Sequence, residues 1–164
     1  MNIEQAFVKC NEMERVVEIV KERLNGRLKD IHLCDPIDVL DSYDTILAND
    51  IKRKTAVSSS KSEWIAIVES KEVNDYAMLM QLSKELQTEV LAVFQYDVTG
   101  EWGYVEMFGG KVMGSYFSEE DDEMEDLLGS KLSQKKIFQP LYMFSEVVRE
   151  RGNGWYIIQR ITKD

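Results

Sequence analysis

The sequence has few of the residues on which catalytic and metal sites are usually built. It contains a single histidine, His32, and two cysteines, Cys10 and Cys34. A closed zinc site needs four ligands, and histidine is the side chain most often used in acid–base catalysis. The motifs of hydrolases, metalloproteases and dinucleotide-binding proteins are also missing from the sequence. We therefore expect no catalytic residue, no metal and no cofactor, although carboxylates alone can perform acid–base chemistry.

Signals for export or membrane insertion are lacking too. Residues 1–5 have neither a basic start nor a long apolar core, so the sequence does not predict a secretory signal. No apolar run approaches the roughly 18 residues of a membrane-spanning helix. Two cysteines without a secretory signal are expected to be free thiols of a cytosolic protein. We expect a cytoplasmic protein that does not bind membranes.

Basic residues are outnumbered in this chain. There are 20 Lys and Arg against 30 Asp and Glu, which gives a net charge of −10. Because binding to phosphates requires a basic surface, this balance argues against nucleic acid and anionic membranes as partners. It is compatible with a basic protein partner, although a need for solubility explains the charge more simply.

The most acidic stretch is residues 119–126. It opens with five consecutive acidic residues, Glu119, Glu120, Asp121, Asp122 and Glu123. Negative charge suits the first turn of a helix, where it meets the positive end of the helix dipole. Three interpretations remain: a surface that binds a basic partner, a loose divalent-ion site, and a solvated helix start. The last is the simplest.

The stretch from Trp64 to Phe117 organises the predicted fold. Residues 64–68 and 90–94 are unbroken apolar runs, which is typical of interior strands. Between them, Asp75 caps a helix of residues 76–86 with apolar residues at helical spacing. A strand, a helix and a second interior strand predict a parallel crossover, in which the two strands lie side by side.

A three-stranded antiparallel meander is predicted over residues 90–117. Gly109 and Gly110 form its two-residue hairpin turn, because glycine accepts positive φ without strain. The meander is rich in aromatic residues: Tyr96, Trp102, Tyr104, Phe108, Tyr116 and Phe117. Most are expected in the core. Those left exposed would mark a protein-binding face or a dimer interface, and we name Trp102, Tyr104 and Tyr116 as candidate partner-binding residues.

The remaining elements follow from shorter patterns. Residues 3–10 predict a strand, and Asn11 caps a helix that ends at Gly26. Further strands are predicted at 27–33, 51–57 and 155–161, helices at 35–49, 119–129 and 140–151, and loops at 58–62 and 130–136. The strand at 51–57 is expected at a sheet edge, because its lysines discourage further pairing.

Together these elements predict a single α+β domain that covers residues 1–164. Its sheet is mixed but mostly antiparallel, has about five to seven strands, and is packed against helices. The serine-rich loop at 58–62 is the one alternative domain boundary. We place it within one domain, because the residues before it have too little apolar surface to fold alone.

Two further polar groups are explained better by structure than by chemistry. His32 and Cys34 would point the same way on a strand, but the sequence supplies no further ligands for a metal. The second group is four aspartates spaced by three residues: Asp35, Asp38, Asp41 and Asp44. This spacing spreads them around a helix and does not match a calcium-binding loop.

Three hypotheses about function follow. The first is a non-enzymatic interaction protein that binds a basic partner through the acidic stretch and the aromatic meander, by analogy with acidic inhibitor or immunity proteins. The second is a small-molecule-binding domain or a carboxylate-based enzyme, which requires a concave pocket with a perturbed carboxyl group. The third is a structural homodimer that pairs through the meander or through edge strands.

Overall fold

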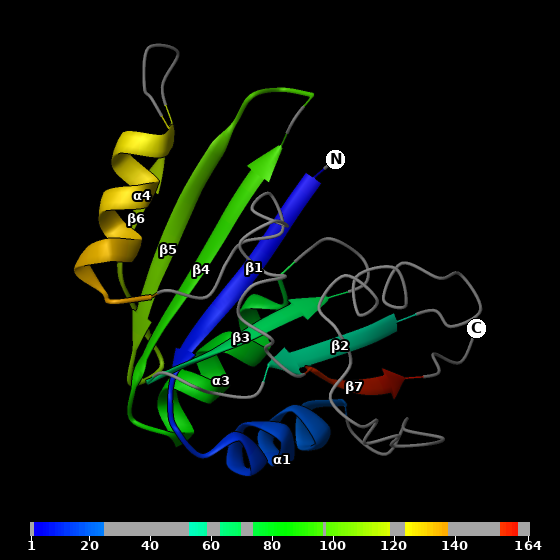
Figure 1. Cartoon of the computed structure of the whole chain (residues 1–164). Coiled ribbons are helices and arrows are strands. Elements are labelled where there is room, and N and C mark those ends of the chain that lie inside the picture. The colour runs from blue at the N-terminus through cyan, green and yellow to red at the C-terminus, as the bar shows by residue number, and fades with distance from the viewer. Residues whose placement is uncertain are drawn as a thin grey trace.

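The computed structural model describes residues 2–24, 53–58, 63–69, 74–96, 98–118, 124–137 and 155–160. Within these residues, seven strands form one sheet in the order β6-β5-β4-β1-β3-β2-β7, and every pairing is antiparallel. The described helices pack on this sheet (Figure 1). The predicted α+β class with a mostly antiparallel sheet is therefore confirmed.

The described strands and helices occur along the chain in the predicted order. The strands are β1 Asn2–Lys9, β2 Arg53–Ser58, β3 Trp64–Glu69, β4 Glu89–Tyr96, β5 Trp102–Phe108, β6 Lys111–Phe117 and β7 Trp155–Arg160. The helices are α1 Met13–Leu24, α3 Tyr76–Glu85 and α4 Met124–Gln134. The prediction of an edge position for the strand at 51–57 is wrong, because β2 lies between β3 and β7. β2 and β3, which lie on either side of residues 59–62 in the sequence, pair with each other.

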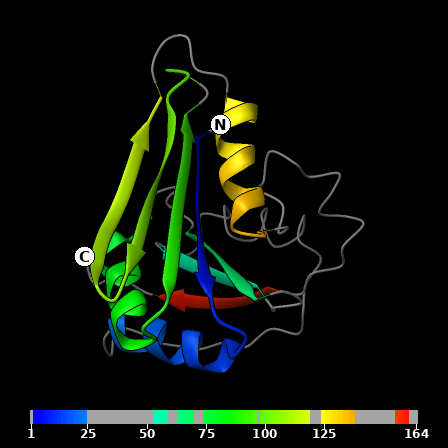
Figure 2. The same ribbon diagram turned by 90° about the vertical axis from the view of Figure 1, so that its left-hand side faces the viewer.

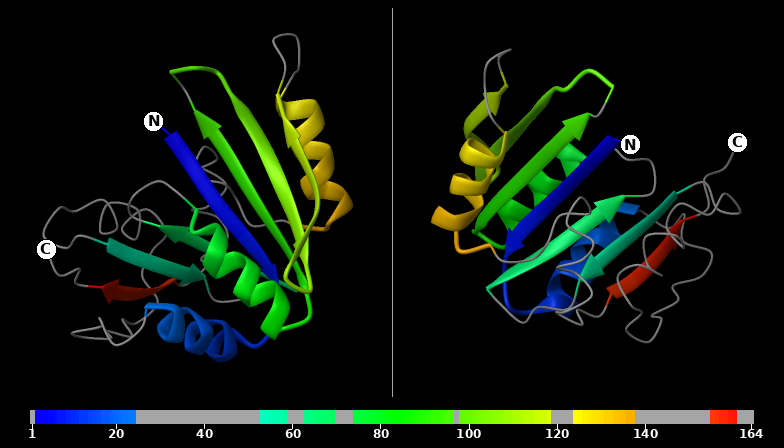
Figure 3. Two further views of the ribbon diagram at one scale, coloured as in Figure 1. Left: turned by 180° about the vertical axis from the view of Figure 1, so that it is seen from behind. Right: turned by 45° about the horizontal axis from the view of Figure 1, so that its top comes forward.

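β1 lies at the centre of the sheet, between β3 and β4 (Figure 3). Ala6 is opposite Ile67 on one side and opposite Ala92 on the other. Because both are antiparallel to β1, β3 and β4 run parallel to each other and are joined through α3, as predicted. Their predicted side-by-side position is wrong, because β1 lies between them. Both apolar runs are buried interior strands, as predicted, but the strand between them comes from the start of the chain. The strand–helix–strand pattern is local and does not reveal a third strand that is distant in sequence.

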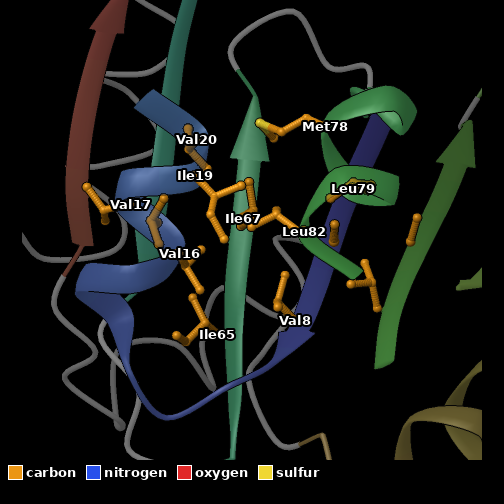
Figure 4. Packing of buried hydrophobic residues seen from close by; sticks show 14 of the residues in the cluster. Val8, Val16, Val17, Ile19, Val20, Ile65, Ile67, Met78, Leu79 and Leu82 are labelled. Carbon is orange, nitrogen blue, oxygen red and sulfur yellow. The ribbon is translucent and has the colours of Figure 1, made fainter. Parts of the chain in front are cut away.

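α1 and α3 cover one face of the sheet. The apolar stripe of α1 (Val16, Val17 and Val20 among others) contacts β2 and α3, and it shares one buried cluster with residues of β1 and β3. Figure 4 shows this cluster, with Ile65 and Ile67 of β3 between the two helices. The spacing of these residues along both helices is the helical period on which the predicted core was based.

α4 covers part of the opposite face. Leu128 is buried there with Trp64, Leu91 and Trp102, and Leu132 packs against the same cluster. Figure 2 shows α4 on one side of the strands and α1 and α3 on the other. Alternate residues of the central strands therefore contact different helices, which explains why their sequences are apolar at every position.

The β5–β6 hairpin is the most exactly predicted part of the meander. Gly109 and Gly110 form the two-residue turn with φ values of 58° and 79°, and Phe108 pairs with Lys111 across it. The turn is fixed to α3, because the Gly110 N–H donates a hydrogen bond of 2.9 Å to Ser83 Oγ. Asp75 caps α3 as predicted, and accepts a hydrogen bond of 3.0 Å from the Met78 N–H.

Two helix boundaries differ from the predictions. α4 continues through Gly129 to Gln134, where a short helix and then a loop were predicted. Packing of Leu132 on the sheet outweighs the cost of a helical glycine, which is about 1 kcal/mol. α1 begins at Met13, and the N–H groups of Arg15 and Val16 point to the Glu12 carbonyl, so Asn11 precedes the capping position.

Several predictions lie outside the described residues. They concern His32, Cys34, the four aspartates from Asp35 to Asp44, and the end of the first helix at Gly26. The predicted elements at 27–33, 35–49 and 140–151 and the acidic residues Glu119, Glu120, Asp121, Asp122 and Glu123 also lie outside them.

Candidate functional site

The outer edge of the β5–β6 hairpin is the most apolar exposed surface among the described residues. β6 is the last strand at one end of the sheet, and no described helix or strand lies along its outer side (Figure 2). The exposed fractions are 57% for Val112, 67% for Met113 and 65% for Phe117, and 45% for Phe108 on β5. Edge strands usually carry charged residues or proline to prevent further pairing, and β6 has one charged residue, Lys111.

The free peptide groups of β6 can be located from its pairing with β5. The Ser118 N–H donates a hydrogen bond of 2.8 Å to the Trp102 carbonyl. Because successive peptide groups of an antiparallel strand point to opposite sides, those of Ser115 and Phe117 point away from β5. This edge can therefore form backbone hydrogen bonds with a further strand.

A β-bulge gives the two sides of β6 different shapes. Glu106 pairs with Gly114 and Met107 pairs with Val112, so Met113 is the extra residue. Met113 lines the cavity described below, whereas Val112 is opposite Met107, which belongs to the core under α3. Bulges frequently redirect a side chain at a sheet edge, and here the bulge turns Met113 toward the side covered by α4.

A cavity of about 280 Å³ opens beside Met113 on the α4 side of the sheet. Its apolar lining includes Trp64 of β3 and Leu91 of β4, which belong to the buried cluster under α4. Val90 and Met107 also border it, although they belong to the cluster under α3. Phe108 and Met113 lie at its exposed side. The cavity is therefore continuous with the apolar edge of β6. Three charged residues complete the lining: Glu89, Glu106 and Lys135.

Lysines of α4 and the turn that follows it pair with the carboxylates of the cavity. Lys135 Nζ lies 3.1 Å from Glu106 Oε1 and 3.4 Å from Glu89 Oε1. Lys131 Nζ lies 3.1 Å from the same Glu106 oxygen, and Lys9 Nζ lies 3.9 Å from Glu89 Oε2. The Trp64 indole N–H donates a hydrogen bond of 2.9 Å to the Lys135 carbonyl, which fixes the end of α4 against β3.

The electrostatics of this group keep both partners charged. Burial raises the pKa of Glu106, but hydrogen bonds from Lys135 and Lys131 outweigh it and leave the pKa below its ordinary value of 4.5. Burial lowers the pKa of Lys135, but its hydrogen bond with Glu106 and the charge of Glu89 raise the net pKa above 10.5. Glu106 is therefore ionised at neutral pH and is a poor proton donor or acceptor.

The aromatic residues predicted to bind a partner lie together under α4. Trp102 is buried, with 4% exposed, and Tyr104 and Tyr116 are half-buried. The ring of Tyr116 lies 5.5 Å from that of Trp102 and 5.9 Å from that of Tyr104, and Lys131 Nζ lies 5.0 Å from the Tyr104 centroid. The partner-binding role of these residues stays a prediction. The exposed residues Phe108, Met113 and Phe117 are not among the residues predicted to bind a partner.

A second polar cluster was not predicted from the sequence. The buried Glu4 carboxylate accepts hydrogen bonds from the Tyr96 hydroxyl and from the Asn74 N–H, one on each oxygen. Burial raises the pKa of Tyr96, and the hydrogen bond and charge of Glu4 raise it further. Burial and Glu4 likewise raise the pKa of Tyr76. Each Glu4 oxygen thus accepts one hydrogen bond. Through them the cluster joins β1 to β4 and to the residues just before α3. The sequence signal that could have indicated this cluster is a charged residue, Glu4, within a predicted strand.

Comparisons with known proteins give no information about function. No protein-family model, no curated protein and no solved structure matches the chain. Within the described residues, no helix is long and apolar enough to span a membrane, and no group of three or more His, Cys, Asp or Glu side chains is arranged to hold a metal ion.

Proposed function

We propose that this chain is a non-enzymatic, cytoplasmic protein-interaction module of the inhibitor or immunity type. It binds an extended segment of a basic partner protein along the outer edge of β6, and the segment becomes an additional strand of the sheet. The observation on which the proposal rests is the edge itself: outward peptide groups at Ser115 and Phe117 beside exposed Val112 and Met113. Strand addition obtains affinity from backbone hydrogen bonds and specificity from side-chain pockets.

Charge supports a basic partner. The net charge is −10, and the five acidic residues from Glu119 to Glu123 begin two positions after the end of β6. Opposite charge speeds association and discourages acidic competitors, and its effect decreases with salt. Within this proposal, the acidic stretch selects the partner electrostatically and β6 provides the contact surface.

A peptide-display selection on the intact chain tests the proposal. We expect the selected peptides to be basic and β-branched, and to bind Ser115→Pro at least ten-fold more weakly. Proline removes an outward N–H without breaking the ladder to β5. Ser115→Thr is the matched control and should bind as the wild type does. Hydrogen exchange should slow at the Ser115 and Phe117 amides in the complex.

Three results would overturn the proposal. They are a selection that yields no binder, binders that are indifferent to Ser115→Pro, and a dimer in light scattering that Ser115→Pro dissociates. The last result would identify a second copy of the chain as the occupant of the edge. The net charge of −10 on each copy opposes that outcome.

The cavity supports small-molecule binding as a second candidate function. A volume of about 280 Å³ lies just below the range of about 300–1,000 Å³ that is usual for drug-sized ligands. The low pKa of Glu106 favours binding over catalysis, because a general acid or base works best with a pKa near the working pH. A fragment screen that follows the Trp64 indole N–H by NMR tests this function, and it fails if no fragment shifts that resonance.

A further inference from the structure

Gly114 of β6 pairs with Glu106, which lines the cavity, and its lack of a side chain leaves an opening at this point of the strand. Within the described residues, the glycines with positive φ are Gly100, Gly109 and Gly110. Gly114 is not among them, so its backbone does not require a glycine. A Cβ atom at Gly114 would meet Glu106 Oε2 at 3.4 Å. The missing side chain therefore leaves Glu106 accessible from the strand edge.

Glu106 presents one oxygen toward this opening. Both of its ion pairs within the described part of the chain, with Lys131 and with Lys135, end on Oε1. Oε2 is the oxygen that lies closest to Gly114. A carboxylate oxygen accepts more than one hydrogen bond, so Oε2 can accept one from a group that enters beside Gly114.

The charges around the cavity select the kind of donor. Three lysines (Lys9, Lys131 and Lys135) and two glutamates (Glu89 and Glu106) form the network, so 3 − 2 leaves one net positive charge. An added cation is repelled by the lysines, and an added anion competes with Glu106 for them. A neutral N–H or O–H donor avoids both costs.

The size and lining of the cavity favour an aromatic group as the body of this donor. The volume of about 280 Å³ and the apolar side chains of Leu91 and Trp64 suit a single large side chain. An aromatic residue on a neighbouring strand is also the natural partner of an edge glycine, whose bare backbone it covers. Tryptophan and tyrosine combine such a ring with a neutral donor.

We propose that the cavity beside Gly114 is a specificity pocket for one tryptophan or tyrosine side chain of the partner segment, which passes over Gly114 and donates a hydrogen bond to Glu106 Oε2. This inference rests on the proposed strand addition at β6 and names the residue that the partner must supply. The ring packs between Met113 and Phe108 at the exposed side and Leu91 inside. Buried aromatic anchors of this kind usually dominate the affinity of an interface.

Three synthetic heptapeptides test the inference by calorimetry on the intact chain. They have lysine at both ends, alternating threonine and valine within, and tryptophan, phenylalanine or alanine at the centre. We expect the phenylalanine peptide to bind about ten-fold more weakly than the tryptophan peptide, because the hydrogen bond to a charged acceptor is lost. The alanine peptide should bind at least about 100-fold more weakly, because it also loses the buried ring.

A matched pair of variants locates the contact. Gly114→Val closes the opening and should reduce the tryptophan peptide to the affinity of the alanine peptide. Ser115→Val adds the same side chain at the next position, which is on the other side of the strand, and should preserve the tryptophan preference. Unfolding by urea checks beforehand that both variants fold as the wild type does.

The outcomes separate this inference from the function on which it rests. If the three peptides bind equally and Ser115→Pro weakens all of them, strand addition stands and the pocket is disproved. If the tryptophan preference survives Gly114→Val, the pocket is also disproved. If the peptides bind with the expected order but are indifferent to Ser115→Pro, strand addition fails, and the passage of the partner segment over Gly114 fails with it. If no peptide binds, both fail.

Discussion

The ring of Phe94 fills the space beside Gly103 in which any other residue would hold its Cβ atom. A Cβ there would lie 2.6 Å from Phe94 Cζ and 2.2 Å from the Tyr116 carbonyl oxygen. The backbone oxygen cannot turn aside, so the hairpin itself must move. We predict that Gly103→Ala lowers the free energy of unfolding by about 2–3 kcal/mol, measured by urea denaturation, because the site is already full.

Gly129 provides the control for this substitution. It lies inside α4, and a Cβ there would meet no atom within 4 Å. Because alanine is the better helix former, Gly129→Ala should raise the free energy of unfolding by about 0.5–1 kcal/mol. Equal effects of the two substitutions on the free energy of unfolding would show that the close approach of Phe94 and Tyr116 to Gly103 does not require a glycine there.

The ion pair between Glu106 and Lys135 predicts a pH-dependent stability. The pKa of Glu106 is lowered in the folded state, so its contribution is present above the ordinary pKa of 4.5 and is lost as the pH falls through the lower, folded value. We expect Glu106→Gln to cost about 1 kcal/mol at pH 7 and progressively less below pH 4.5. Urea denaturation at a series of pH values measures this difference.

An exposed glutamate of α1 serves as the reference for that series. Glu18→Gln should change the free energy of unfolding by less than about 0.5 kcal/mol at pH 7, because surface substitutions away from such contacts have small effects. A pH-independent cost of Glu106→Gln would mean that packing, and not charge, connects α4 to the sheet.

The Glu4 carboxylate holds Tyr96 in its neutral form. The pKa of Tyr96 is raised above its ordinary value of 10.0 by burial and by Glu4, so its stabilising contribution is full below pH 10 and is lost as the pH rises further. We predict that Glu4→Gln brings the Tyr96 titration back toward its ordinary range, as followed by phenolate absorbance. The substitution should also cost about 2 kcal/mol, because an amide N–H₂ then faces a donor. Tyr96→Phe identifies which titration step belongs to Tyr96. An unchanged titration in Glu4→Gln would contradict the prediction.

Asp75 stabilises α3 through its capping hydrogen bond to the Met78 N–H. Asp75→Ala should cost about 1 kcal/mol, because the N–H loses its acceptor. Asp75→Asn retains a capping oxygen and loses the charge that pairs with Arg23, at 3.9 Å, so its cost should stay within a few tenths of a kcal/mol. Thermal unfolding of both variants measures the two effects, and equal losses would assign the stabilisation to charge.

The sequence predicts the local elements of this fold well and the arrangement of its sheet less well. Apolar runs such as Trp64–Val68, the cap at Asp75 and the turn at Gly109 are local signals, and the structure agrees with each. The position of β1 depends on pairing with residues more than 50 positions away. No pattern inside a strand specifies its neighbours, so the sequence predicts β3 and β4 side by side although β1 lies between them.

The candidate site was predicted only in its general location. The aromatic meander does contain the apolar edge, but Trp102 is buried and Met113 is exposed. The difference comes from the bulge at Met113, which shifts the register of β6, and from the continuation of α4 over Tyr104. Both features depend on contacts between elements that a single-sequence pattern does not contain.

The central position of β1 has a consequence for dissecting this molecule. Without residues 1–10, β3 and β4 would each lose an antiparallel partner, and the sheet would separate into the triplets β6-β5-β4 and β3-β2-β7. The same residues supplied as a free peptide would present a pairing edge to each of the two exposed borders. The fold is thus suited to use as a split reporter, in which one short fragment restores the continuity of the whole sheet.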